Sequence, residues 1–116
     1  MSASRMRRVD EAMRQVLGDA LAQELKDPRI GFVTVTDVKT ATDLRHARVY
    51  VSVLGDVAAQ DATLAGLRSA HGYLQSRVAA ELRLKRTPEL EFELDRTAER
   101  AARLERLLQD EEAGGA

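Results

Sequence analysis

The chain contains 116 residues, no cysteine and a formal net charge of -1. This length predicts one domain with a core that is stable without disulfides or bound metals. The lack of cysteine excludes disulfides, zinc–thiolate sites and thiol catalysis. The longest apolar runs fall far short of the roughly 18 residues that span a membrane, and no apolar segment follows the N-terminal charges as in a secretory signal. We therefore expect a cytoplasmic protein that does not bind membranes.

The charges are distributed unevenly along the chain. Residues 1–86 contain 14 Lys and Arg against 10 Asp and Glu, a net charge of +4, whereas residues 87–116 contain 4 against 9, a net charge of -5. Phosphate groups are attracted to surfaces on which Lys and Arg gather. The mildly basic body is therefore where a nucleic-acid-binding surface is expected, and the acidic C-terminal segment is not.

The first part of the chain predicts a helix followed by two strands. Residues 5–26 carry apolar side chains at the i, i+3, i+4 spacing of a helix packed on one side. Pro28 ends this helix, because the residue before a proline avoids the α conformation. Residues 32–39 and 47–53 are rich in β-branched side chains, which favour strands. Their connection is too short for a crossover helix, so the two strands are expected to be antiparallel.

The middle of the chain predicts two helices with a kink between them, and then a third strand. The helical pattern begins at about Asp61, a residue type that caps helix N-termini, and ends before Pro88. Gly72 lies inside this pattern. Because an internal glycine costs a helix about 1 kcal/mol, we expect Gly72 to be a geometric requirement of the kink. Residues 89–95 alternate strictly between polar and apolar side chains, which predicts a half-buried strand.

The C-terminal part of the chain predicts a helix and an acidic tail. Residues 97–109 have a helical pattern, and the three leucines in it are expected to contact the core. Residues 110–116 are acidic and contain no large apolar side chain, so we expect a flexible tail. The predicted domain therefore covers residues 1–109, and the tail covers residues 110–116.

These elements together predict a known type of fold. Three strands with one apolar face need helices against that face, so we expect an α+β domain with a three-stranded sheet, helices on one side and an added C-terminal helix. The order helix, strand, strand, two helices, strand is that of the type II KH domain, an RNA-binding fold. KH domains hold the nucleic-acid backbone with a Gly-x-x-Gly loop. This chain has no such motif and carries Ala70, His71 and Gly72 at the equivalent place.

Short matching segments, spread over about residues 5–108, point to one family. These segments are Arg7-Arg8-Val9, Lys26-Asp27-Pro28-Arg29, residues 33–38, Asp43-Leu44, residues 47–55, residues 70–74 and Pro88-Glu89-Leu90 with Phe92 and Asp95. In this order and spacing the chain resembles the ribosome-binding factor A family, in which an Ala-x-Gly helical kink replaces the Gly-x-x-Gly loop.

The resemblance implies a ribosome maturation factor. Such a factor binds the free 30S small subunit and its 16S rRNA, in the 5′-terminal region, during late assembly. It is needed for efficient 5′-end processing of the 16S rRNA precursor, and it supports growth at low temperature. The resemblance also implies a monomer that uses no cofactor and works beside assembly GTPases. The expected mechanism is differential binding, in which the factor holds one conformation of immature rRNA and leaves when mature contacts form.

Basic residues in three regions are the candidate RNA contacts. They lie on the first helix, around the first two strands, and on and after the central helices. The candidates are Arg7, Arg8, Arg45, Arg48, Arg77, Arg83, Lys85 and Arg86. We expect all of them except Arg7 and Arg8 to share one continuous surface.

Aromatic side chains are scarce, which affects the expected mode of RNA recognition. Phe32 and Phe92 are expected in the core, and Tyr50 is expected on the open face of the sheet, where it could stack on a base. Proteins that read splayed bases usually expose several aromatic side chains. We therefore expect recognition to rest on phosphate contacts and shape, with little base readout.

Two other functions fit parts of the sequence. Asp37 and Asp43 flank the connection between the first two strands and could form a Mg²⁺-dependent nuclease site, although such residues more often bond backbone N–H groups at turns. His46 and His71 have no carboxylate or cysteine at a metal-ligand spacing, so no metal site is expected.

The second alternative is a protein-binding adaptor in ribosome assembly, without direct rRNA contact, that docks through its C-terminal helix. Since no catalytic constellation is visible, we do not expect an enzyme.

Overall fold

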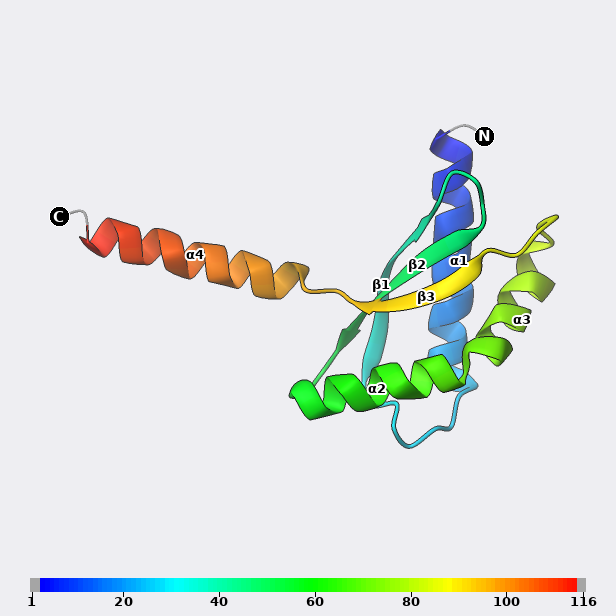
Figure 1. Cartoon of the computed structure of the whole chain (residues 1–116), viewed down its shortest axis with the longest axis horizontal. Helices are drawn as coiled ribbons and strands as arrows, with labels where there is room; N and C mark the ends of the chain where they lie inside the picture. The colour runs from blue at the N-terminus through cyan, green and yellow to red at the C-terminus, as the bar shows by residue number, and fades with distance from the viewer. Residues whose placement is uncertain (1–2, 115–116) are drawn as a thin grey trace.

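The computed structural model describes residues 3–114, and within them the chain forms four helices and three strands (Figure 1). In chain order these are α1 (Ala3–Gln23), β1 (Val33–Thr40), β2 (His46–Val53), α2 (Val57–Ser69), α3 (His71–Leu82), β3 (Glu89–Leu94) and α4 (Thr97–Gly114). The predicted order of helices and strands is confirmed. In this part of the chain, every helix is too short or too polar to cross a membrane.

The three strands form one mixed sheet in the order β1-β2-β3. β1 and β2 are antiparallel, as predicted, and β3 runs parallel to β2 because α2 and α3 carry the chain back along the sheet. Val49 of β2 pairs with Val38 of β1 and with Phe92 of β3, and all three side chains are buried on the same face. This topology is that of a type II KH domain, as predicted.

Helices α1, α2 and α3 cover the apolar face of the sheet. Their fully buried side chains, which include Met13 and Leu17 of α1, Leu67 of α2 and Leu74 and Val78 of α3, form one core with the strand residues. Burying each of the larger ones stabilises the fold by about 1.5–3 kcal/mol. α1 runs across the sheet and α2 crosses its lower end in Figure 1. The opposite face of the sheet is polar and stays open.

Two helix boundaries differ from the predicted ones. α1 ends at Gln23, well before Pro28, because the N–H groups of Glu24 and Leu25 both bond the carbonyl of Ala20 and close the last turn. α2 begins at Val57 and not at about Asp61. Its N-cap is Asp56, whose Oδ1 accepts a hydrogen bond of 2.9 Å from the N–H of Ala59.

The break between α2 and α3 lies at Ala70, the first of the three residues Ala70, His71 and Gly72 at which the kink is predicted. Ala70 has φ −85° and ψ 5°, and α3 begins at His71. Gly72 therefore lies in the first turn of α3, and a Cβ added there would meet nothing within 4 Å. The structure gives Gly72 no geometric role in the kink. Of the glycines in α2 and α3, Gly66 is the constrained one, since a Cβ there would lie 2.6 Å from Cγ1 of Ile30.

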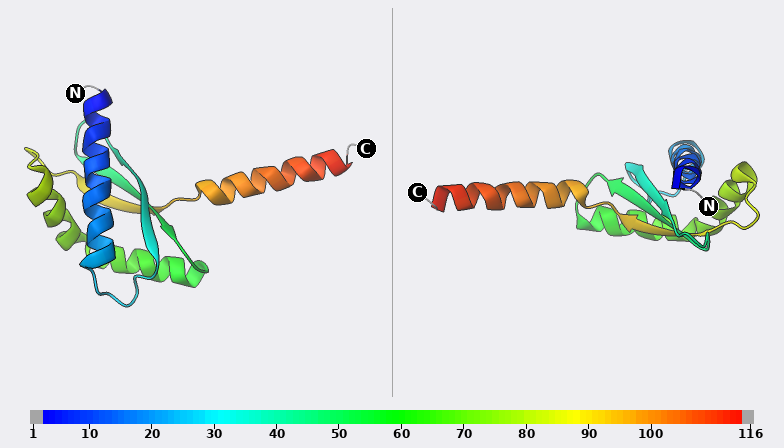
Figure 2. Two further views of the ribbon diagram at one scale, coloured as in Figure 1. Left: turned by 180° about the vertical axis from the view of Figure 1, so that it is seen from behind. Right: turned by 90° about the horizontal axis from the view of Figure 1, so that it is seen from above.

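Helix α4 extends away from the body of the protein (Figures 1 and 2). It continues through Gly114, past the predicted end at residue 109, and Gly115 and Ala116 of the predicted tail lie outside the described residues. Leu104, Leu107 and Leu108 are more than half exposed, so the prediction that they contact the core is wrong. A helical pattern of apolar residues shows that one face of a helix is apolar, but it does not show what covers that face.

Deleting residues 101–116, which keeps the bond from Thr97 to Asp95, should leave the thermal stability of the body nearly unchanged. The reason is that the α4 leucines bury no surface against the core, and stability follows buried apolar area. Melting followed by circular dichroism, with full-length protein as the reference, measures the effect. A fall in melting temperature of more than a few degrees would show that α4 packs on the body in solution.

Of the two phenylalanines, only Phe92 is in the core. Phe32 is 81% exposed, and the prediction that it is buried is wrong. It lies just before β1, next to Leu54, whose N–H bonds the carbonyl of Phe32. Leu54 and Val57, which follow β2, are exposed as well, so this corner of the sheet carries an uncovered apolar patch.

Candidate RNA-binding surface

Three segments that are distant in sequence meet at one end of the protein. These are the N-terminal turns of α1, the β1–β2 connection and the loop from α3 to β3, all of which lie toward the same end in Figure 1. Residues from all three segments line one surface hollow. Its lining residues are Arg5, Asp43, Leu44, Leu84, Lys85 and Arg86.

The β1–β2 connection is shaped so that Arg45 reaches the start of β3. Leu44 adopts a positive φ of 61°, and Oδ1 of Asp43 accepts a hydrogen bond of 3.0 Å from the N–H of Arg45. The carbonyl of Arg45 then accepts a bond of 2.8 Å from the N–H of Glu89. This bond holds the backbone of Arg45 at the start of β3, the strand that follows the loop containing Lys85 and Arg86.

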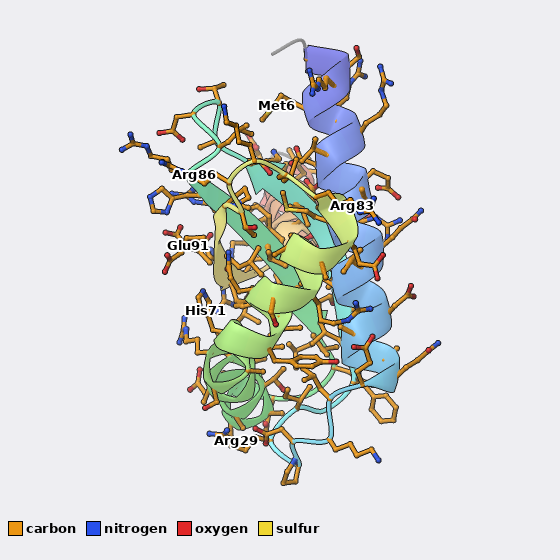
Figure 3. All side chains as sticks on the ribbon, turned by 90° about the vertical axis from the view of Figure 1, so that its right-hand side faces the viewer. Met6, Arg29, His71, Arg83, Arg86 and Glu91 are labelled. Atoms are coloured by element: carbon orange, nitrogen blue, oxygen red, sulfur yellow. The ribbon has the colours of Figure 1, made fainter. Side chains whose placement is uncertain are left out.

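The end of α3 adds further positive charge. Arg83 adopts the left-handed conformation, with φ 47°, and ends the helix there. Lys85 and Arg86 follow in the loop, and all three side chains are exposed. Met6, Arg83 and Arg86 lie in the upper half of Figure 3, while Arg29 lies at the opposite end of the protein.

The two α1 arginines are exposed but extend this surface in different directions. Arg8 lies one helical turn after Arg5, which lines the hollow with Lys85 and Arg86. Arg7 lines a second hollow, between α1 and β1, together with Arg14 and Lys39. We call the set of six exposed cations from the three segments the basic end: Arg7, Arg8, Arg45, Arg83, Lys85 and Arg86.

Arg14 and Lys39 are not among the candidate contacts from the sequence, although they flank the same hollow as Arg7. Both belong to the basic groups that the sequence places on the first helix and around the first two strands. Their hollow also contains Asp10, Glu11 and Asp37. It is therefore less basic than the hollow that Lys85 and Arg86 line.

Arg77 is not among the residues that line the hollow with Lys85 and Arg86, and its guanidinium is held in ion pairs. Its guanidinium binds Glu24 at the end of α1, with Nε 2.8 Å from Oε1, and Glu81 one turn further along α3, at 3.1 Å. Tyr73 donates a hydrogen bond to the same Glu24 carboxylate. Hydrogen bonds from Arg77 and Tyr73 lower the pKa of Glu24, and those to Glu24 and Glu81 raise the pKa of Arg77. Arg77 therefore joins α1 to α3.

Arg48 lies on the open face of the sheet, among carboxylates. Its Nε is 3.9 Å from Oε1 of Glu93, and it pairs across the β2–β3 ladder with Glu91. Tyr50 lies on the same face, half-buried, and hydrogen bonding to Tyr50 and the charge of Glu93 raise the pKa of Arg48. The charge around Arg48 is therefore mixed, and its place on one surface with Lys85 and Arg86 stays a prediction.

The two aspartates considered for a nuclease site have structural roles. The N–H of Val38 donates to Oδ1 of Asp37 at 2.9 Å, and Asp43 holds the turn at Arg45. Both therefore bond local backbone N–H groups, as turn residues do. Across residues 3–114 no three His, Cys, Asp or Glu side chains are grouped closely enough to hold a metal ion.

Asp95 connects the end of β3 to β1 and to the start of α4. Its Oδ1 accepts a bond of 2.9 Å from the N–H of Thr97, and its Oδ2 accepts one of 2.7 Å from Oγ1 of Thr36. Hydrogen bonds from Thr97 and Thr36 favour the charged carboxylate and lower the pKa of Asp95 to about 2.

The low pKa of Asp95 predicts how its contribution to stability depends on pH. Because the pKa is lower in the folded state than the usual value near 4, the contribution is present above about pH 4 and is lost as the pH falls toward 2. Asp95→Asn should therefore melt below the wild type at neutral pH, and the difference should shrink in acid. An NMR titration of the Asp95 carboxyl carbon measures the pKa directly. A midpoint near 4 would contradict the prediction.

The fold and the basic end define a class of protein: small α+β domains of type II KH topology that have a helix–helix kink in place of the Gly-x-x-Gly loop. A family model described as ribosome-binding factor A matches residues 5–108. The chain belongs to this family of ribosome-binding factors.

Solved structures agree with this assignment. The chain is similar to the crystal structure of ribosome-binding factor A from Thermus thermophilus, with 27% identity, a TM-score of 0.71 and coverage of 79% of this chain and 97% of that chain. It is similar to the NMR structure of a Thermotoga maritima protein described as a candidate ribosome binding factor A, with 36% identity, a TM-score of 0.71 and coverage of 80% and 89%. A homology model of the Thermus thermophilus factor, fitted into a cryo-EM map of its complex with the 30S subunit, matches with 30% identity, a TM-score of 0.61 and coverage of 72% and 88%.

Proposed function

We propose that this protein is a non-enzymatic ribosome maturation factor that binds the free 30S subunit, contacts 16S rRNA and is needed for efficient 5′-end processing of the 16S precursor. The observation that carries this proposal is the basic end, whose six exposed cations lie on three segments that border one hollow. Family membership supports it, as does the description of the Thermus thermophilus relative in complex with the 30S subunit. The same proposal includes a cytoplasmic location and a monomeric state. It also includes action near the 5′-terminal region of the rRNA, beside assembly GTPases, in support of growth at low temperature.

The mechanism that fits this surface is recognition of phosphates by shape and charge. The residues that line the hollow beside Lys85 and Arg86 include no aromatic side chain, so this surface suits phosphate oxygens better than splayed bases. Such a surface distinguishes rRNA conformations by the spacing of their phosphates. The factor stabilises the conformation that matches, and it dissociates when the mature rRNA contacts remove that match.

The salt dependence of binding tests the proposal. Each phosphate contact contributes about one unit to the slope of log affinity against log salt concentration. Binding of the labelled protein to purified free 30S subunits should therefore weaken steeply as salt rises, with a slope of roughly −3 to −6 for a surface of this size. A slope near zero would contradict rRNA contact through the basic end.

The alternative, an adaptor that binds a ribosomal or assembly protein without rRNA contact, is favoured by a different observation. The leucines of α4 and the patch of Phe32, Leu54 and Val57 are exposed and apolar. Apolar docking depends weakly on salt, so the same titration separates the two functions. Salt-independent binding that is lost on deletion of residues 101–116 would establish the adaptor.

A further inference from the structure

The outer edge of β3 is an incompletely bonded strand edge. β3 ends the sheet and pairs with β2 alone. The N–H groups of Glu89 and Asp95 bond the carbonyls of Arg45, just before β2, and of Val51 in β2, at 2.8 and 2.7 Å. In a parallel ladder the N–H and C=O of one residue point to the same side of the strand, and those of the next residue point to the opposite side. Leu90, Phe92 and Leu94 therefore direct their backbone groups away from the sheet.

The side chain of Gln75 already bonds the first part of this edge as a neighbouring strand would. Its Nε2 donates to the carbonyl of Pro88 at 2.6 Å, and its Oε1 accepts from the N–H of Leu90 at 3.2 Å. Beyond Leu90, no group in residues 3–114 bonds the outward N–H of Phe92 or Leu94. The edge is therefore open over its second half.

A surface hollow runs along this open part of the edge. One side is formed by consecutive β3 residues from Glu89 to Glu93, and the other by Arg68 at the end of α2 and His71 at the start of α3. Glu91 and His71 lie on the same side of the protein in Figure 3. Nε2 of His71 is buried and has no hydrogen-bond partner among the described residues, with Oε1 of Glu89 3.9 Å away.

The charge beside this edge is negative. Glu89, Glu91 and Glu93 alternate with the buried residues and project onto the open face next to the edge. Each of them has one histidine or arginine beside it: His46 lies 3.2 Å from Glu91, Arg48 3.9 Å from Glu93 and His71 3.9 Å from Glu89, so one arginine and two histidines face three carboxylates. A row of carboxylates repels phosphate, and two copies of β3 placed edge to edge would bring like charges together. A cationic polypeptide matches this row.

We propose that the β3 edge binds an extended basic segment of another protein as an added strand, with Lys or Arg at every second position. The backbone of the added strand bonds Phe92 and Leu94, and its cationic side chains lie over Glu91 and Glu93. The intervening side chains enter the hollow beside Arg68 and His71. This surface is separate from the basic end, so the protein holds an rRNA phosphate surface and a basic protein strand at two places.

The test uses a fluorescent synthetic peptide that alternates arginine and threonine, and a peptide of the same composition with its arginines grouped. Leu94→Pro removes an outward N–H that has no partner among the described residues, which an edge strand tolerates. Leu94→Ala is the matched control, because it loses the same side chain but keeps the N–H. Leu94→Pro should weaken binding of the alternating peptide by at least about tenfold relative to Leu94→Ala, and the amide signals of Phe92 and Leu94 should shift on titration of the wild type.

A second variant covers the case in which Leu94→Pro unfolds, as circular dichroism would reveal. Glu91→Gln with Glu93→Gln leaves the backbone unchanged and should weaken the alternating peptide by about tenfold. Equal affinity for the alternating and the grouped peptides, or unchanged affinity of the double variant, would overturn the proposal. Displacement of the peptide by single-stranded oligouridylate, with shifts at the same two amides, would overturn it in favour of a nucleic-acid groove.

Discussion

Lys85→Glu combined with Arg86→Glu should weaken binding to the free 30S subunit by at least about tenfold at moderate salt, and it should flatten the salt dependence. These two residues lie in the loop where α1, the β1–β2 connection and the start of β3 meet. Each substitution removes a cation that we propose contacts phosphate and places a carboxylate in its position. The slope of log affinity against log salt should therefore become less negative by about two units.

A matched charge change elsewhere separates a local contact from the effect of net charge. Arg103→Glu with Arg106→Glu alters the net charge by the same amount on α4, where both side chains are exposed and distant from the basic end. This control should change subunit binding by less than about twofold. Similar losses for both double variants would mean that overall charge determines affinity. Circular dichroism of each variant confirms that its fold is intact.

Periodicity in the sequence predicted those parts of the fold in which one side of an element is buried. In β2 the alternation of Ala47, Val49 and Val51 with polar residues identified the buried face, and the structure buries all three. The burial predicted for Phe32 is wrong, because Phe32 lies just before β1 and outside the alternation of buried and exposed residues that would show whether its side chain faces the core. The α4 leucines were mispredicted for a different reason. Their spacing predicted a helix correctly, but no local pattern shows whether another element lies against it.

The candidate site could be predicted only in part, because charge is visible in a sequence and charge pairing is not. The exposed cations of the loop after α3 are visible in the sequence as a cluster. The ion pair of Arg77 is not visible there, because its partner Glu24 is 53 residues away and only the packing of α1 on α3 brings them together. The carboxylate beside Arg48 is not visible either, because Glu93 lies on a parallel strand whose register the sequence does not specify.

Gly66→Ala and Gly72→Ala should change stability in opposite directions. Alanine has the higher helix propensity, by up to about 1 kcal/mol, and both glycines are helical. At Gly66 a new Cβ would lie 2.6 Å from Cγ1 of Ile30. Isoleucine is stiff at this atom because it is branched at Cβ, and overpacking a well-packed core costs roughly 1–3 kcal/mol. Gly66→Ala should therefore be destabilising, despite its gain in helix propensity.

At Gly72 a new Cβ would meet nothing within 4 Å, so Gly72→Ala should raise the melting temperature slightly and leave subunit binding unchanged. Because both substitutions add the same methyl group to a helix, the difference between their free energies of unfolding, roughly 1–3 kcal/mol, reports mainly the contact with Ile30. Urea unfolding of the two variants measures it, and Ile30→Val with Gly66→Ala should recover part of the loss. Destabilisation by Gly72→Ala, or impaired subunit binding, would show that the kink at Ala70 depends on glycine after all, through a conformation other than the one described.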